Sequence, residues 1–320
     1  MGRTDLPTAQ QEVLHRAIRL EWFTIAYTSV TIVLVALVVG NSQAMKTAWI
    51  EDMLSLVPQI SFLMALLLIR KPPTRRFPYG LHRAMGVGHL VAGVALLSIG
   101  GSLAVESVIG LVTAEHPTIG TVRLFGVTVW LGWLMIGVMA LIVIGPFFYG
   151  PAKMKVAPKL HNKVLYADAD MAKADWTTNA ASIVGVLGIG LGLWWLDGAS
   201  ALFISAGIVW DGVKNSRAAL VDLMDQRART YDGGQPDPLN ALIVQELERL
   251  PWVREAAVRV RDMGQVFHVE AFVVPRRGTL RAHRIEQARE AVAALDWKVQ
   301  DVVIVVVPSL PEEAARTGRE

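Results

Sequence analysis

The run WFTIAYTSVTIVLVALVVG, residues 22–40, decides the class of fold. A helix that crosses the hydrocarbon core of a bilayer needs about 20 predominantly apolar residues. This run has that length and carries no charged side chain. Comparable runs follow along the chain, and together they predict six membrane-spanning helices, at residues 22–40, 47–69, 85–112, 122–149, 162–190 and 197–215.

The composition agrees with a membrane protein, and it is uneven along the chain. Hydrophobic residues make up 53% of the 320 residues, and the mean hydropathy is +0.41. Apolar runs fill the chain up to residue 215, beyond which charge returns at the density of a soluble domain. The chain has no cysteine, which excludes disulfides and thiolate metal sites.

Basic residues predict the orientation in the membrane. They gather at the N-terminus and in every second loop, whereas the opposite loops contain only Lys46 and Arg123. Cytoplasmic loops carry the excess of Lys and Arg, so we expect both termini in the cytoplasm. Because these short loops account for the basic pI of 9.2, we expect the lipid bilayer as a partner and no nucleic acid.

Acidic residues interrupt two of the predicted spans. The stretch YADADMAKADWTTNAAS, residues 166–182, places Asp168, Asp170 and Asp175 in the fifth span. Glu51 and Asp52 lie in the second span. Carboxylates are costly in hydrocarbon, and those that occur there usually line an ion or proton pathway. The two acidic helices therefore indicate a protein that moves a cation.

The C-terminal part predicts a small α+β domain. A helix at 238–250 precedes two β-rich runs joined by a hairpin signal, a second helix at 279–295 and a buried strand at 299–307. This α-β-β-α-β order gives an open-faced sandwich with one free sheet face. The predicted organisation is an N-terminal cytoplasmic segment 1–20, a six-helix transmembrane domain 21–228, a linker 229–238, a cytoplasmic dimerisation domain 239–310 and a disordered tail 311–320.

Four stretches, in order, resemble the cation diffusion facilitator family. They are KPPTRRFPYGLHRA (71–84), LYADADMAKADWTTNAAS (165–182), DGASALFISAGIVWDGVKNSRAALVDLMDQRA (197–228) and VREAAVRVRDMGQVFHVEAFVV (253–274). The resemblance implies a homodimeric protein of the bacterial inner membrane with a ferredoxin-like, metallochaperone-like cytoplasmic domain. It also implies efflux of a divalent cation by proton antiport with alternating access.

The resemblance further implies a tetrahedral metal site shared by the second and fifth spans, yet the family's His/Asp quartet is not present. In the family, each of these two spans contributes two ligands four residues apart. The ligand positions of the fifth span correspond here to Met171 and Asp175. The second-span pair falls on Ser55 and Gln59, and a shift of one turn places it on Glu51 and Ser55 instead.

Each of the two spans nevertheless has three candidate ligands on one face, at positions i, i+3 and i+7. They are Asp52, Ser55 and Gln59 on the second span, and Asp168, Met171 and Asp175 on the fifth. We hypothesise a metal site rebuilt from these side chains. In it, residues at the same level of the two packed helices face each other in three layers, which pair Asp52 with Asp168, Ser55 with Met171, and Gln59 with Asp175. Oxygen ligands favour Mg²⁺ or Mn²⁺, whereas the thioether of Met171 favours softer metals. The expected cargo is therefore Mg, Mn, Fe, Co, Ni or Zn, and no permanently bound cofactor is expected.

Other residues carry weaker expectations. Arg83 and Asp225 align with a basic–acidic pair that, in the family, links the loop after the second span to the exit of the sixth, or they are two solvated charges. His268 and His283 are expected at the surface of a cytoplasmic domain without regulatory metal. The alternative function is a non-transporting assembly partner or metal sensor. No nucleophile–base pair recommends an enzyme.

Overall fold

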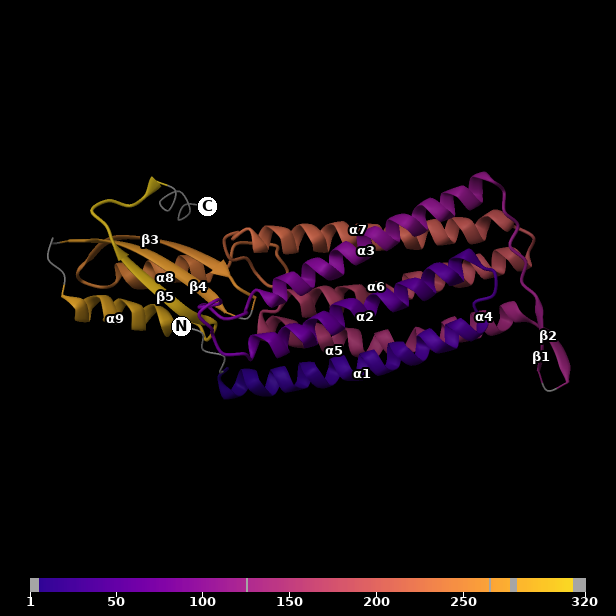
Figure 1. Ribbon diagram of the computed structural model, residues 1–320, viewed down its shortest axis with the longest axis horizontal. Helices are drawn as coiled ribbons and strands as arrows, with labels where there is room; N and C mark the ends of the chain where they lie inside the picture. The colour runs from indigo at the N-terminus through magenta and orange to yellow at the C-terminus, as the bar shows by residue number, and fades with distance from the viewer. Residues whose placement is uncertain (1–5, 125, 265, 277–280, 313–320) are drawn as a thin grey trace.

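The apolar runs form a bundle of long helices, and the C-terminal part of the chain forms a separate sheet domain at one end of it (Figure 1). The computed structural model describes residues 6–124, 126–264, 266–276 and 281–312. Residues 1–5 of the expected N-terminal segment and residues 313–320 of the expected tail lie outside the described residues.

Five spans within the described residues are long and apolar enough to cross a membrane. They are α1 (Thr8–Val38), α2 (Gln43–Ile69), α3 (Ala84–Val112), α4 (Leu131–Ile142) continued by α5 (Ile144–Leu160), and α7 (Trp194–Leu223). Helix α6 (Lys163–Gly190) carries three aspartates, and it packs against α2, α5 and α7 in the same bundle.

The fourth predicted span is displaced along the chain. Residues 122–149 were expected to be helical, but the structure forms a hairpin of β1 (Thr121–Leu124) and β2 (Val127–Trp130), and the span follows it. The reason is local, because two of the four residues of β1 and three of the four of β2 are β-branched, and Gly126 supplies a positive φ of +86° at the turn.

A proline explains the break between α4 and α5. Pro146 has no N–H, so it cannot donate to the carbonyl of Ile142 four residues earlier. The hydroxyl of Tyr27, on α1, donates to that carbonyl instead at 2.8 Å, and it accepts a hydrogen bond from the N–H of Gly145 at 3.2 Å. Tyr27 thus satisfies the backbone groups at a kink where no water is available.

The sheet domain packs two helices on one face of three strands. Its elements follow the order α8 (Leu239–Glu248), β3 (Val253–Asp262), β4 (Phe267–Pro275), α9 (Ala282–Ala293) and β5 (Val299–Val306). The strands lie in the order β3-β4-β5, with β4 antiparallel to β3 and parallel to β5. Buried residues of the strands and both helices form one apolar core, leaving the other sheet face uncovered by α8 and α9 (Figure 1).

The segment between the two parts is tied to the sheet domain. The N–H of Ala228 donates to the carbonyl of Val260 at 2.7 Å, and the N–H of Asp237 donates to the carbonyl of Ala228 at 2.9 Å. Ala228 is 1% exposed and belongs to the domain core. The residues expected as a linker therefore have fixed partners.

Candidate cation site

The acidic faces of α2 and α6 meet inside the bundle. The two helices lie side by side and run in opposite directions (Figure 1). The hydroxyl of Thr178, on α6, donates to Oε1 of Glu51, on α2, at 3.2 Å. The charges of Glu51 and Asp52 both interact with that of Asp175, which lies one turn from Thr178. Three carboxylates from two helices are thereby gathered in one region.

The layers expected from the sequence are wrong. The expected pairing of Asp52 with Asp168 and of Gln59 with Asp175 holds only for two parallel helices. Because α2 and α6 are antiparallel, the numbers rise on one helix as they fall on the other. Asp52 consequently lies near Asp175, whereas Asp168 lies seven residues earlier on α6, toward the start of that helix.

The other predicted ligands have separate surroundings. The hydroxyl of Ser55 donates to the carbonyl of Asp52 within its own helix, at 2.8 Å. Gln59 is 3% exposed, and its Oε1 has no hydrogen-bond partner among the described residues. Met171 packs against the bundle core and also lines a cavity. The structure therefore brings together Asp52 and Asp175, adds Glu51, and does not gather all six residues.

Asp168 is held by a lysine. The ammonium of Lys153, on α5, contacts Oδ2 of Asp168 and lies 3.1 Å from Oε2 of Glu21, on α1. All three side chains are buried. The sequence counted Lys153 as a loop residue and did not identify Glu21.

Tyr149 connects this lysine to the acidic region. Its hydroxyl donates to Oδ2 of Asp175 at 3.5 Å, and the ammonium of Lys153 lies 5.7 Å from the centre of its ring. Tyr149 and Lys153 are one turn apart on α5, so both project from the same helix face. The pair was not identified from the sequence.

A cavity of about 560 Å³ opens at the end of the bundle nearest the sheet domain. Residues of α3, α6, α7 and the segment after α7 line it, among them Asp170, Met171 and Asp211. Asp211 acts electrostatically on both Glu51 and Asp175. At the cavity wall, Lys214 donates to Oδ2 of Asp170 at 2.8 Å. The cavity therefore opens on the expected cytoplasmic side and contains Asp211, whose charge acts on the acidic region.

The junction between bundle and sheet domain is polar. The guanidinium of Arg83 contacts Oδ1 of Asp225 and donates to the carbonyl of Leu223 at 2.9 Å. Asp225 has a positive φ of +65°, and its other oxygen lies 3.4 Å from Arg261 of β3. The predicted pair of Arg83 and Asp225 is thus in contact at the exit of α7.

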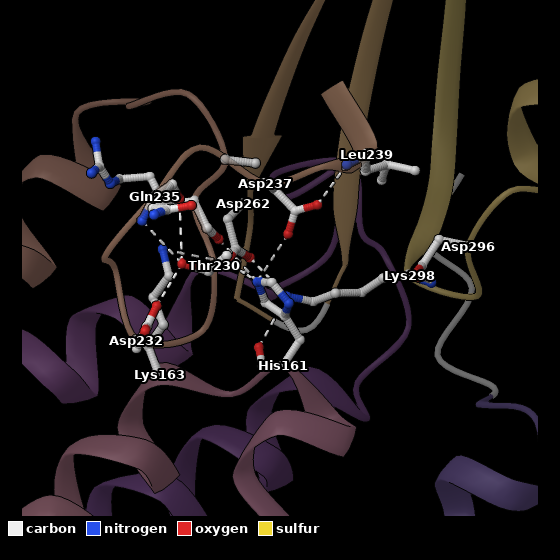
Figure 2. Close-up of polar contacts among 12 residues, drawn as sticks. His161, Lys163, Thr230, Asp232, Gln235, Asp237, Leu239, Asp262, Asp296 and Lys298 are labelled. Atoms are coloured by element: carbon white, nitrogen blue, oxygen red, sulfur yellow. Dashed lines mark hydrogen bonds and ion pairs between the residues drawn. The ribbon is translucent and has the colours of Figure 1, made fainter. Parts of the chain in front are cut away.

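A second set of contacts anchors the connection between α5 and α6 (Figure 2). His161 donates from Nε2 to the carbonyl of Arg229 at 3.1 Å, and its ring lies between Asp237 and Asp262. Lys298 donates to the carbonyl of His161 at 3.2 Å and to Oδ1 of Asp262 at 3.1 Å. His161 therefore inserts from the bundle into the sheet domain.

Charge and burial set the protonation states at this junction. Burial, helped by the charge of Lys298, lowers the pKa of His161 to about 4, so the ring is neutral at physiological pH. Burial alone raises the pKa of Asp262, but Lys298 and Lys163 outweigh it and the net shift is downward. Lys163 also donates to both oxygens of Asp222, at 2.8 and 2.7 Å, which joins α6 to α7.

His268 corrects another expectation. It was expected at the surface, but it is 6% exposed, and its Nδ1 lies 3.0 Å from Oδ2 of Asp301 on the neighbouring strand.

Among the described residues, no three His, Cys, Asp or Glu side chains are close enough together to hold a metal ion in this conformation.

Comparisons with known proteins identify the family of the chain. Residues 21–224 match the family described as the cation efflux transmembrane domain. The chain belongs to the cation diffusion facilitators. This membership makes it a membrane transporter of metal cations, and the match covers every helix that contributes to the acidic region.

Three relatives show how similar the chain is to other proteins in sequence. The uncharacterized transporter YdbO of Bacillus subtilis is 26% identical over 257 residues, which cover 77% of this chain and 80% of that protein. A probable cation efflux system protein of Mycobacterium tuberculosis is 26% identical over 306 residues, covering 93% and 84%. The manganese efflux system protein MneS of Bacillus subtilis is 23% identical over 247 residues, covering 75% and 77%.

Proposed function

We propose that this cation diffusion facilitator exports a divalent cation in exchange for protons, at a site that Asp175 shares with Glu51 and Asp52. The observation that carries the proposal is the hydrogen bond from Thr178 to Glu51, at 3.2 Å. It holds the acidic turn of α2 opposite the acidic turn of α6, inside the bundle. No counter-charge from a described lysine or arginine contacts these three carboxylates, in contrast to Asp168.

The donor set favours a hard cation. Every donor in the region is an oxygen, from carboxylates and the hydroxyls of Thr178 and Tyr149. Oxygen donors without imidazole or thiolate suit Mn²⁺ or Mg²⁺ better than Zn²⁺. The relative MneS is named for manganese efflux, which is in line with the same preference. Manganese is therefore the first cargo to test.

Proton exchange follows from placing several carboxylates together. Neighbouring buried carboxylates repel one another, so they stay ionised at low cost only with a cation between them. When the cation leaves, protons replace its charge, and metal binding displaces them again. The described conformation supports access from the cytoplasmic side, because the cavity that reaches Met171 and Asp211 opens there. Export then requires this cavity to close and a path to open at the other end.

The topology and assembly belong to the same proposal. We take α6, the fifth in chain order, as a membrane span in addition to the five apolar ones, which places both termini on the cytoplasmic side of a bacterial inner membrane. We also take the uncovered sheet face as the contact between two copies. Val303 on this face is 40% exposed, and Phe272 is partly buried beneath the guanidinium of Arg259, 5.1 Å from its ring. Apolar side chains on an uncovered sheet face are stabilised when a second sheet covers them.

Flux in proteoliposomes tests the proposal. We expect an imposed pH gradient to drive uptake of Mn²⁺, in a screen that also includes Mg²⁺, Fe²⁺, Co²⁺, Ni²⁺ and Zn²⁺. Asp175→Asn removes one of the three charges and is expected to reduce uptake to the background of empty vesicles. Asp170→Asn is the matched control, because Asp170 lies on the same helix but pairs with Lys214, and it is expected to keep most of the flux.

Two outcomes contradict the proposal. One is uptake that ignores the pH gradient, and the other is Asp175→Asn protein that transports as fast as the parent. If no metal moves in folded protein, the alternative of a non-transporting assembly partner or sensor is favoured. Light scattering on the same preparation measures the mass, which is that of two chains if the protein is a dimer.

A further inference from the structure

Glu21, Lys153 and Asp168 form a group of three buried charges that the transport site does not use. Glu21 and Lys153 are 0% exposed, and Asp168 is 5% exposed. The carboxylates come from α1 and α6, and the ammonium reaches them from α5, which lies between those helices in the packing. Three helices thus direct charged groups to one point.

The group contains two carboxyl groups and one ammonium. Two carboxylates share a single ammonium, and Oε1 of Glu21 is buried without a hydrogen-bond partner among the described residues. Buried charges are usually paired and fully hydrogen-bonded, because an unpaired charge away from water is expensive. Two carboxylates that face one cation, with an oxygen left over, are an arrangement that proteins also use to hold a divalent ion.

We propose that Glu21 and Asp168 form a second cation position of the bundle, which the ammonium of Lys153 occupies as a tethered cation. A tethered ammonium cannot diffuse away, so this position stays filled whatever metal is present. A divalent cation that enters the bundle is thereby excluded from Glu21 and Asp168. The site around Asp175 is left as the place where it can bind.

The position is adjacent to the proposed path of the ion. Asp168 lies seven residues before Asp175 on α6, a rise of about 10 Å along the helix. Tyr149 bridges the two regions, because it contacts Asp175 through its hydroxyl and Lys153 through its ring. Without the tethered cation, an entering divalent ion meets two uncompensated carboxylates beside the transport site. Lys153 is therefore a specificity-determining residue. This role in transport rests on the proposed function. That Lys153 fills the position between Glu21 and Asp168 does not.

Equilibrium binding of Mn²⁺ to the purified full-length protein tests the proposal. Lys153→Ala removes the ammonium and leaves room beside both carboxylates. We expect this variant to bind one more Mn²⁺ per chain than the parent protein in isothermal titration. The added ion is expected to disappear in Lys153→Ala with Asp168→Asn, and also in Lys153→Ala with Glu21→Gln.

The control variant is Lys155→Ala. Lys155 is an exposed lysine two residues away on the same helix, so its removal changes the net charge equally without opening the buried position. We expect this variant to bind the parental number of ions. A gain of one ion in Lys155→Ala as well would overturn the proposal, because it would show a surface effect. So would a parental number of ions in Lys153→Ala.

Stability measurements decide the matter if Lys153→Ala unfolds. Mn²⁺ is then expected to restore folding in a concentration-dependent manner, since a ligand that binds only the native state stabilises it. The variant that combines Glu21→Gln, Lys153→Met and Asp168→Asn removes all three charges, and it is expected to fold without Mn²⁺. If the triple variant folds but no divalent cation restores Lys153→Ala, the group is a structural ion cluster and the proposal is wrong. None of these measurements requires transport, so they remain informative if the flux experiment fails.

Discussion

Asp197 is a fully buried carboxylate near the start of α7. It belongs to the first turn of α7, and it accepts hydrogen bonds from the hydroxyl of Ser42 at 2.6 Å and from the N–H groups of Gln43 and Ala44 at 2.6 and 3.2 Å. These N–H groups are at the start of α2, where backbone donors have no partner within the helix. A negative charge there also interacts favourably with the helix dipole.

Replacing this carboxylate is expected to be costly. Asp197→Ala leaves a hydroxyl and two buried N–H groups without an acceptor, which lowers the free energy of unfolding by about 3 kcal/mol. Thermal unfolding in detergent measures the change. Glu106→Ala is the control, because the Glu106–Lys46 pair is about half exposed and an exposed pair contributes about 1 kcal/mol or less. Equal losses in the two variants would contradict the capping role.

Residue identity also explains where the site prediction failed. Asp52 and Asp175 were identified because charged residues in apolar helices stand out in any sequence. Lys153 was misassigned because it falls among other lysines in KMKVAPK, and only the fold turns it inward between α1 and α6. The partner of a buried charge is set by packing, and the spacing along one helix does not contain that information.

Close packing of α3 against α7 depends on glycine. A Cβ at Gly212 of α7 would lie 2.4 Å from the backbone nitrogen of Leu97 of α3, and one at Gly93 of α3 would lie 2.6 Å from the backbone nitrogen of Ser216. Small residues let helix backbones approach in membranes, where van der Waals packing is a main source of attraction between helices. The two glycines define the contact from both sides.

Gly212→Ala is therefore expected to separate α3 from α7. The added methyl meets backbone, which cannot rotate away, and we expect a loss of about 2 kcal/mol in the free energy of unfolding. Gly207→Ala on the same helix is the matched control, because a Cβ there meets no atom within 4 Å. It is expected to be neutral or to gain up to ~1 kcal/mol from helix propensity. Melting temperatures of the two variants in detergent distinguish them, and identical values would rule out the packing argument.

Elements differ in how well the sequence predicts them. The continuous apolar runs of α1 to α3 made long helices the expected structure, because each run can satisfy its backbone only as a helix in lipid. The hairpin before α4 was missed because VTVW and the following apolar residues merge into one hydrophobic run. Hydropathy averages over such a boundary, whereas β-branching and Gly126 mark it locally.

At the scale of the whole molecule, the junction around His161 links the sheet domain to the helix that carries Asp175. Protonation of this residue is expected to loosen the junction. Its docked pKa, about 4, lies below the ordinary value of 6.5, so the undocked state binds the proton more readily. Docking is therefore complete above pH 6.5 and weakens as the pH falls from 6.5 toward 4. The full loss is up to about 3 kcal/mol.

Pulsed-EPR distances between the sheet domain and the bundle measure this docking. The chain has no cysteine, so single labels on exposed positions of α5 and α9 report without interference. His161→Asn is the matched variant, because Asn keeps a donor, tolerates the positive φ of +45° and does not titrate. It is expected to abolish the distance change between pH 6.5 and 4. A distance change that persists in His161→Asn would show that another group causes the loss of docking. The titration of Asp262 can be told apart from that of His161, because the pKa of Asp262 is lowered and its effect on docking appears only at lower pH.

The amino-acid sequence was enough to predict that the chain enters a membrane, that a small sheet domain follows the bundle, and that acidic residues lie on two of its helices. These features depend on composition and on periodicity within single segments, where neighbours in sequence are neighbours in space. The packed fold was needed to show that Asp52 lies near Asp175, that Lys153 occupies the position beside Asp168 and Glu21, and that His161 enters the sheet domain. Such contacts join residues far apart in the chain, and they depend on the direction and rotation of packed helices.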